Sequence, residues 1–231
     1  MRQELERLGA RYRLDSAAVG RLDVLLNGLY GDPRSPTTVR DPDETLRQHI
    51  ADSLVGLEVE EIRMAGTVAD LGSGAGLPGF VLAIALPRVE VRLVESQASK
   101  CAYMAAMAAK LAITNVRIVC ARAEEWPDGV GGHDVVVSRA LASQQVVLEY
   151  AAPLLEMGGL LVEWRGKRQP TDEAAAERAA VELGLRAVET RKVEPFDGAR
   201  DRHLHLFEKV AATPGRFPRR AGLARKRPLG G

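Results

Sequence analysis

A glycine-rich segment carries the clearest chemical signal in this sequence. It reads DLGSGAGLPG over residues 70–79 and directly follows a short apolar stretch, residues 67–71. Glycine adopts backbone dihedrals that other residues avoid, and it lets a ligand lie against the main chain. The spacing is G-x-G-x-G, with Leu77 where a dinucleotide-binding loop has Gly or Ala, and no Gly-Lys-Ser/Thr follows as in a P-loop. The segment therefore predicts a cofactor cradle of Gly72, Gly74 and Gly76.

Two acidic positions follow this loop at spacings that suit an adenosine. Glu95 ends the second predicted strand, 23 residues after Gly72. A carboxylate at that place can accept hydrogen bonds from both hydroxyls of a ribose. Ala123 and Glu124 lie beyond the third strand, where the edge of an adenine would fall, although Glu124 is equally consistent with a simple helix start. The sequence thus favours a nucleoside-containing cofactor.

Arg139 is the candidate for the reaction centre. It ends the fourth strand, and an arginine at the carboxyl end of a central strand can fork onto a carboxylate or a phosphate. A surface ion pair is the alternative. His49 precedes an apolar helical stripe and is interpreted either as a packed side chain or as a site residue. The histidines show no metal-ligand spacing, so no metal is expected.

Alternating apolar strands and helices must position these residues. Strands are expected at residues 67–71, 91–94, 116–119, 134–137, 160–164, 186–193 and 203–209, and helices at 80–86, 98–111, 145–155 and 173–183. This order predicts an α/β fold, a doubly wound and mostly parallel sheet covered on both faces. The last two strands have only a loop between them, so they form a hairpin and one runs antiparallel.

Helical periodicity dominates the first part of the chain. Helix is expected over residues 1–30 and from Asp43 to about Gly56, with a Pro-rich loop between them. We therefore divide the chain into an N-terminal helical cap at 1–65, a catalytic domain at 66–211 and a C-terminal tail at 212–231.

The composition of the 231 residues is that of a globular protein, with 46% hydrophobic and 27% charged residues. No stretch is apolar enough to span a membrane, and the charged N-terminus is not a secretory signal. Cys101 and Cys120 are too few and too scattered to predict a disulfide, so both are expected to be reduced core thiols. These features predict a cytoplasmic protein.

The charge of the chain is unevenly distributed. The 20 residues of the tail contain six cations and no carboxylate, whereas the whole chain has a net charge of +1. The cations are Arg216, Arg219, Arg220, Arg225, Lys226 and Arg227. A basic arm on a mildly acidic body predicts binding to nucleic-acid phosphates. The alternative is a tail that packs on the body, with Phe217 and Leu223 buried and some arginines in ion pairs.

Several segments together resemble one family, the bacterial small-subunit ribosomal RNA (guanine-N7) methyltransferase G, also called glucose-inhibited division protein B. They are RQHIADSL (47–54), VADLGSGAGLPG (68–79), VVVSRALAS (135–143), GGLLVEWRGK (158–167) and RFPRRAGLARKRPL (216–229). The resemblance covers nearly the whole chain in the right order. The glycine loop alone indicates only a class I methyltransferase, whereas HIADSL, SRA and FPRRxG together are typical of this family. Arg165 is a departure, because the family usually has a lysine there.

The resemblance implies a class I S-adenosylmethionine-dependent methyltransferase fold and methyl transfer to N7 of guanine 527, in the 530 loop of 16S rRNA. The cofactor would then contact Gly72, Gly74, Leu77, Glu95, Ala123, Glu124 and Arg139. Guanine N7 has an in-plane lone pair and no proton, so no general base is required, which agrees with the lack of an acid–base dyad. The implied partners are 16S rRNA or the small ribosomal subunit, and the protein is expected to act as a monomer.

Two other functions share part of the pattern. A nucleotide-dependent oxidoreductase would use the glycine loop and Glu95, but the glycine spacing disfavours it. A ribosome-assembly factor with an inactive cofactor fold would bind RNA without catalysis, but the complete glycine loop argues against it. Titration with S-adenosylmethionine and with NADH separates the three.

Overall fold

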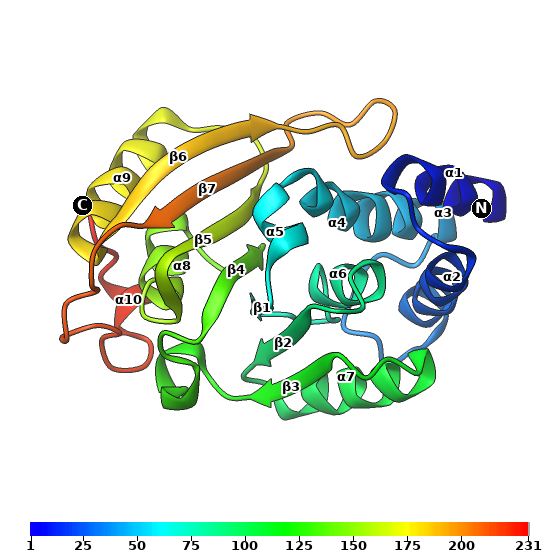
Figure 1. Cartoon of the computed structure of the whole chain (residues 1–231), viewed down its shortest axis with the longest axis horizontal. Coiled ribbons are helices and arrows are strands. Elements are labelled where there is room, and N and C mark those ends of the chain that lie inside the picture. Colours follow the sequence, from blue (N-terminus) through cyan, green and yellow to red (C-terminus); the bar gives the residue numbers. More distant parts are fainter. Residues whose placement is uncertain (231) are drawn as a thin grey trace.

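A seven-stranded sheet forms the centre of the molecule in the computed structural model, which describes residues 1–230 (Figure 1). Its order is β3-β2-β1-β4-β5-β7-β6, and every neighbouring pair is parallel except the two that involve β7. The strands are β1 (Thr67–Leu71), β2 (Glu90–Glu95), β3 (Val116–Cys120), β4 (His133–Arg139), β5 (Leu155–Arg165), β6 (Leu185–Lys192) and β7 (His203–Lys209). The predicted mostly parallel sheet with one late antiparallel strand is confirmed.

The chain order reverses between β1 and β4, which lie side by side in the middle of the sheet. The helices that follow these two strands leave the sheet on opposite faces, so a crevice opens at the strands' carboxyl ends. The glycine loop follows β1, and Arg139 is the last residue of β4. Topology therefore brings the two strongest sequence signals to one place.

Helices cover both faces of the sheet (Figure 1). On one face, α6 (Gly79–Ala85) and α7 (Ala98–Leu111) share an apolar core with the N-terminal helices. On the other face, α8 (Gln144–Ala151), α9 (Pro170–Leu183) and α10 (Leu223–Lys226) enclose a second core. Strand residues alternate between the two cores: Val135 and Val137 point to the first, and Val136 points to the second. No helix within residues 1–230 is long and apolar enough to cross a membrane.

The N-terminal segment is helical, as predicted, but it is divided into short pieces. They are α1 (Arg2–Tyr12), α2 (Ser16–Gly31), α3 (Pro42–Thr45), a π-helical turn (Leu46–Ala51), α4 (Asp52–Leu54), a 3-10 turn (Val55–Glu58) and α5 (Glu60–Met64). Asp15 caps α2 by accepting a hydrogen bond from the Ala18 N–H at 2.7 Å. The helix expected from Asp43 to about Gly56 is confirmed as helical conformation, although a π turn and a 3-10 turn replace part of the α-helix. Such turns often occur at functional sites.

Two boundaries near β5 also differ from the prediction. The helix expected to reach Leu155 ends at Ala151, and Leu155 already belongs to β5. The strand expected at residues 160–164 begins earlier, so Gly158 and Gly159 lie inside it, and Gly158 has a φ of 82°. The pairing of β4 with β5 shifts register at this point. A glycine pair can signal an irregularity within a strand as well as a turn.

Candidate active site

Two adjoining cavities lie at the carboxyl ends of the central strands. The larger has a volume of about 640 Å³ and the smaller about 230 Å³, and Gly72, Lys100 and Ala140 line both. Gly74, Leu77 and Arg139 line the larger cavity, whereas Glu95, Ala123 and Glu124 line the smaller. The predicted cofactor residues are therefore distributed over one continuous crevice, except Gly76, which lines neither cavity.

The glycines of the loop serve different purposes. Gly72, Gly74 and Gly76 have φ values of 70°, 59° and 87°, in the left-handed region that glycine tolerates. A Cβ on Gly72 would meet Leu141 Cδ1 at 2.5 Å, and one on Gly76 would collide with the Phe80 ring. A Cβ on Gly74 would meet nothing closer than the Gly72 carbonyl oxygen, at 3.8 Å. The neighbouring glycines are thus required by packing, while Gly74 leaves space on the cavity side.

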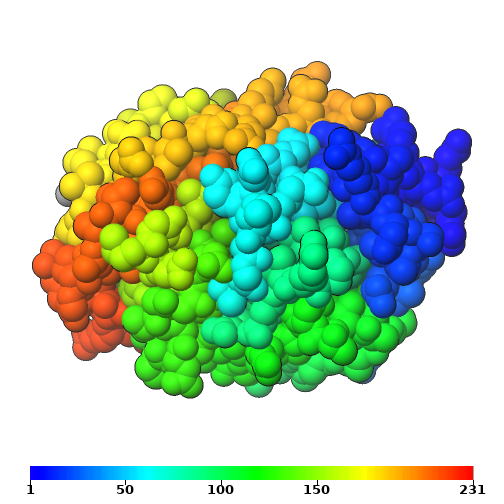
Figure 2. Space-filling model, in the orientation of Figure 1, coloured from blue at the N-terminus to red at the C-terminus, as the bar shows by residue number. Residues whose placement is uncertain are grey.

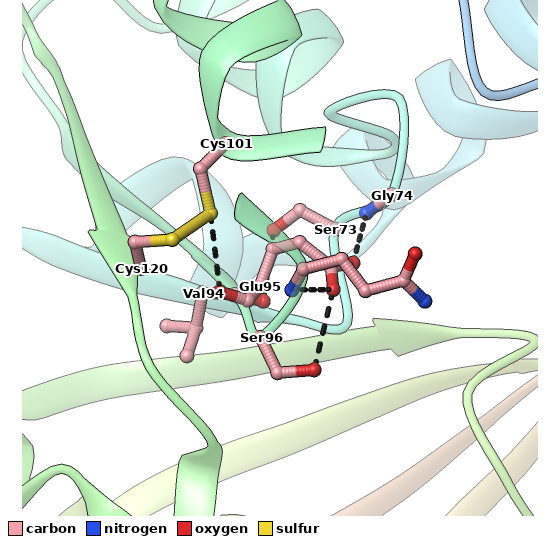
Figure 3. The surroundings of a disulfide bond; sticks show 8 residues. Ser73, Gly74, Val94, Glu95, Ser96, Cys101 and Cys120 are labelled. Carbon is pink, nitrogen blue, oxygen red and sulfur yellow. Dashed lines mark hydrogen bonds between the residues drawn. A yellow bond between two sulfur atoms is a disulfide. The ribbon is translucent and has the colours of Figure 1, made fainter. Parts of the chain in front are cut away.

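Asp70 and Glu95 hold the loop at two points, its end at Gly79 and its middle at Gly74. Asp70 is fully buried and its Oδ2 accepts a hydrogen bond from the Gly79 N–H at 3.0 Å; burial raises the pKa of this carboxyl group to about 7. Glu95 accepts hydrogen bonds from the Gly74 N–H at 3.2 Å and from the Gln97 N–H at 2.9 Å (Figure 3). Each Glu95 oxygen has further lone pairs that can accept ligand hydroxyls.

A disulfide between Cys101 and Cys120 lies directly beside Glu95 (Figure 3). It joins the first turns of α7 to the end of β3, with the Cα atoms 5.9 Å apart, and Cys101 Sγ lies 3.3 Å from the Glu95 carbonyl oxygen. The expectation of reduced thiols in the core is therefore wrong for this structure, and Cys120 is exposed. The helix between β2 and β3 folds back along the sheet, which brings together two cysteines 19 residues apart.

Removing this disulfide is expected to destabilise the protein measurably. Closing a loop of this size lowers the entropy of the unfolded chain, so the double variant Cys101→Ser/Cys120→Ser should lose about 3 kcal/mol of unfolding free energy. Urea denaturation with and without a dithiol reductant measures the effect. The wild-type midpoint should fall on reduction, while that of the double variant should not change. Identical wild-type midpoints in the two buffers would contradict the bond.

Arg139 is held by a buried carboxylate that the N-terminal segment supplies. Its Nη1 donates to Asp52 Oδ2 at 2.9 Å and to the Gln48 carbonyl oxygen at 3.2 Å. Arg202 Nε lies 3.4 Å from the other Asp52 oxygen, and Trp164 Nε1 donates to the Asp52 carbonyl oxygen at 2.8 Å. Arg139 remains in the cavity wall, with 15% of its side chain exposed. Three distant segments therefore converge on Asp52.

His49 lies within the π turn and also lines the larger cavity. Its Nε2 lies 2.7 Å from Thr37 Oγ1, and burial together with the charge of Arg139 lowers its pKa to about 4. The imidazole is therefore neutral at pH 7. A neutral ring can orient a polar ligand, but it offers no positive charge to the cavity. Residues 1–230 gather no group of three metal-binding side chains here or elsewhere.

The C-terminal tail packs against the body of the protein (Figure 2). Phe217 is buried, Arg219 Nε donates to the buried Glu149 carboxylate at 2.8 Å, and Arg216 pairs with Glu182 at 3.0 Å. The Gly222 N–H donates to Glu124 Oε1 at 3.0 Å, which brings the tail to the edge of the smaller cavity. The tail thus packs on the body, as the alternative prediction from the sequence had it. RNA binding by its exposed cations stays a prediction.

The tail's ion pair gives a stability prediction with a matched control. Arg219→Ala strands the Glu149 charge, whose side chain is 1% exposed, so it should lower the unfolding free energy by about 3 kcal/mol. Arg220→Ala removes an exposed cation that forms no ion pair within residues 1–230 and should change stability by less than about 0.5 kcal/mol. Chemical denaturation of both variants checks this. Equal, small losses would show that the tail contributes little to folding.

Comparison with known proteins gives a consistent result. A family model described as GidB, rRNA small subunit methyltransferase G, matches residues 31–204. Proteins named ribosomal RNA small subunit methyltransferase G include one from Chloroflexus aggregans, 38% identical over 90% of this chain and 87% of its own, and one from Rubrobacter xylanophilus, 37% identical over 83% and 76%.

Solved structures resemble the fold. A SAM-dependent methyltransferase from Aquifex aeolicus superposes with a TM-score of 0.56 and 16% identity, covering 74% of this chain and 94% of its own. The Methanococcus jannaschii fibrillarin pre-rRNA processing protein gives 0.55 and 17%, covering 70% and 74%. At such identities the likeness shows the class I methyltransferase fold and nothing about substrate.

Proposed function

The chain belongs to the rRNA small subunit methyltransferase G family, and from this membership we propose that it transfers a methyl group from S-adenosylmethionine to N7 of a guanine in the 530 loop of 16S rRNA. The observation that carries the proposal is the pair of adjoining cavities at the β1/β4 switch point. The smaller is lined by Glu95 and Glu124, and the larger is lined by Arg139 and is rich in cations.

The cavities suggest how the two substrates are arranged. Adenosine would occupy the smaller cavity, with its ribose hydroxyls on Glu95 and its base beside Ala123 and Glu124. The methionine part would then lie along Gly72, Gly74 and Leu77 toward the larger cavity. The cofactor supplies an electrophilic methyl group on a sulfonium. This leaves the larger cavity, next to Arg139, for a guanine that has left its stack.

The residues around the larger cavity fit a reaction that needs positioning and little acid–base chemistry. Guanine N7 presents a lone pair without a proton, so alignment of N7 with the methyl group is the main requirement. Asp52 is already engaged by Arg139 and Arg202, and His49 is neutral at pH 7. Arg139 is therefore assigned to orient the base and the cofactor at their junction.

The substrate atom can be tested directly. Small ribosomal subunits, or their RNA, from a strain that lacks this protein are incubated with radiolabelled S-adenosylmethionine, and the modified nucleoside is mapped. We expect 7-methylguanosine at a single position of the 530 loop. The same RNA made with 7-deazaguanine keeps its base-pairing edge but has no N7, so it should accept no label there. Label on the deaza RNA would contradict N7 as the acceptor.

Glu95 provides a prediction for the cofactor half of the site. Glu95→Gln keeps the size of the side chain and one carbonyl oxygen but removes the charge. Hydrogen bonds to a charged group contribute about 1.5–3 kcal/mol, so the dissociation constant for S-adenosylmethionine should rise about 10- to 150-fold. Calorimetry measures this change, and thermal unfolding checks the fold. An unchanged affinity would contradict the proposed hydrogen bonds between Glu95 and the ribose hydroxyls.

A further inference from the structure

The larger cavity has a strong excess of positive charge. Its lining contains five cations, namely Lys100, Arg139, Arg165, Lys167 and Arg202, and within the described chain one carboxylate, Asp52. S-adenosylmethionine does not neutralise this excess, because it carries a sulfonium and an ammonium group against a single carboxylate. A cavity that stays positive when the cofactor is bound is complementary to a polyanion.

Three of these cations come from one wall of the cavity, where β5 ends and β7 begins. Arg165, the last residue of β5, pairs in register with His203, the first residue of β7. Lys167 follows two residues after Arg165, and Arg202 immediately precedes β7. His203 Nδ1 lies 3.0 Å from the Gly166 carbonyl oxygen, which ties the two strand ends together. The antiparallel pairing therefore gathers Arg165, Lys167 and Arg202 at one edge.

A buried carboxylate lies beside each of the two arginines of this wall. Arg165 Nη1 lies 3.2 Å from Oε1 of Glu163, which is 2% exposed, and it also donates to the Ala142 carbonyl oxygen at 3.0 Å. Arg202 Nε lies at ion-pair distance from Asp52 Oδ1, 3.4 Å, without a hydrogen bond to it. A guanidinium has five N–H donors, and these contacts occupy only part of each set. Each arginine thus lies against a buried carboxylate and keeps donors to spare, an arrangement suited to phosphate oxygens.

The two lysines of the cavity complete the pattern. Neither Lys167 nor Lys100 forms an ion pair with any residue between 1 and 230, and Lys167 is exposed. By contrast, two of the six tail cations, Arg216 and Arg219, are already paired with carboxylates. The cavity therefore offers two lysines without a carboxylate partner beside its three arginines, while four tail cations also have no ion pair among residues 1–230.

We infer that Arg165, Lys167 and Arg202 form a phosphate-binding site that grips the RNA backbone next to the target base, with Asp52 and Glu163 as positioning residues for the two arginines. The inference rests on the proposed function and deepens it, because it assigns the RNA strand to the β5/β7 wall. The tail is then a secondary contact, and the nucleotide enters the larger cavity between this wall and Arg139.

The dependence of RNA binding on salt tests the site. Each phosphate neutralised on single-stranded nucleic acid contributes about −0.7 to the slope of log K against log salt. Binding of a fluorescent single-stranded RNA with the 530-loop sequence is measured without S-adenosylmethionine. The variant Lys167→Gln/Arg202→Gln should flatten the slope by about 1.4, and Lys167→Gln alone by about 0.7. The single variant keeps the test valid if loss of Arg202 impairs folding.

Charge-matched variants serve as controls. Arg88→Gln/Lys110→Gln removes two exposed cations away from both cavities and should leave the slope unchanged. Arg220→Gln/Lys226→Gln removes two exposed tail cations and should flatten the slope less than the cavity variant does. Calorimetry with S-adenosylmethionine should give affinities within about twofold of wild type for the cavity variant, because Glu95 and the glycine loop are intact.

A wild-type slope in both cavity variants would overturn the site, and a flattening confined to the tail variant would place the RNA on the tail instead. These outcomes are separate from failure of the proposed function. A protein that bound S-adenosylmethionine and methylated the guanine with an unchanged slope would lose only the phosphate site. A protein that methylated nothing, yet showed the flattened slope, would keep the phosphate site and lose the proposed reaction.

Discussion

Replacing Arg139 with alanine is expected to lower single-turnover methyl transfer by about 100-fold at saturating S-adenosylmethionine, because the group that aligns base and cofactor is lost. The same change strands Asp52, a carboxylate with 8% of its side chain exposed, beside the weaker contact to Arg202. Arg139→Ala should therefore also reduce stability by about 3 kcal/mol. Activity and stability must be measured together for this residue.

A second variant separates the two effects. Asp52→Asn/Arg139→Ala removes the stranded charge, so most of the lost stability should return while methyl transfer stays low. Rapid-quench assays with radiolabelled cofactor, beside urea denaturation, give both quantities. If the double variant regained activity together with stability, Arg139 would be only the partner of Asp52, and its assignment to the reaction centre would fail.

The other large effect is expected at Gly74. In Gly74→Val the new side chain extends into the larger cavity, where the structure leaves room for a ligand. S-adenosylmethionine should bind at least about 100-fold more weakly, equivalent to about 2.7 kcal/mol. The φ of 59° adds strain, so some loss of stability is also expected. Calorimetry on the folded variant measures the loss of affinity.

Gly131 offers the matched control for this experiment. Its φ of 63° is close to that of Gly74, a Cβ there would meet nothing within 4 Å, and it lines neither cavity. Gly131→Val therefore imposes a similar backbone strain without reaching the cofactor. It should lose stability to a similar degree and bind S-adenosylmethionine normally. Equal affinities for the two variants would show that Gly74 does not face the cofactor.

Local sequence signals were sufficient for the sheet and the glycine loop. The central strands are short, apolar and buried on both faces, so their pattern stands out from the polar turns around them. Gly72 and Glu95 could be paired from spacing alone, because consecutive βα units place the ends of neighbouring strands together. Arg139 followed from the same rule.

The sequence did not predict the contacts between residues that are far apart along the chain. Asp52 lies within the HIADSL motif, yet nothing local indicates that Arg139, Trp164 and Arg202 converge on it. The disulfide was not predicted, because the spacing of the cysteines does not show that α7 places Cys101 beside the end of β3. The tail was interpreted by charge, whereas Glu149, its buried partner, sits on a helix 70 residues away. Asp52 and Arg219 lie within motifs, whereas Glu149 and the two cysteines do not.

The position of β7 determines when this protein can finish folding during its synthesis. β6 is made before β7 but pairs only with it within the described sheet, so neither can join β5 until residues 203–209 are available. The edge of β5 therefore stays open while β6 is made and until β7 is added, and an open strand edge is vulnerable to wrong pairing. Arg202 immediately precedes β7, so the positively charged cavity is completed only when this last strand takes its place in the sheet.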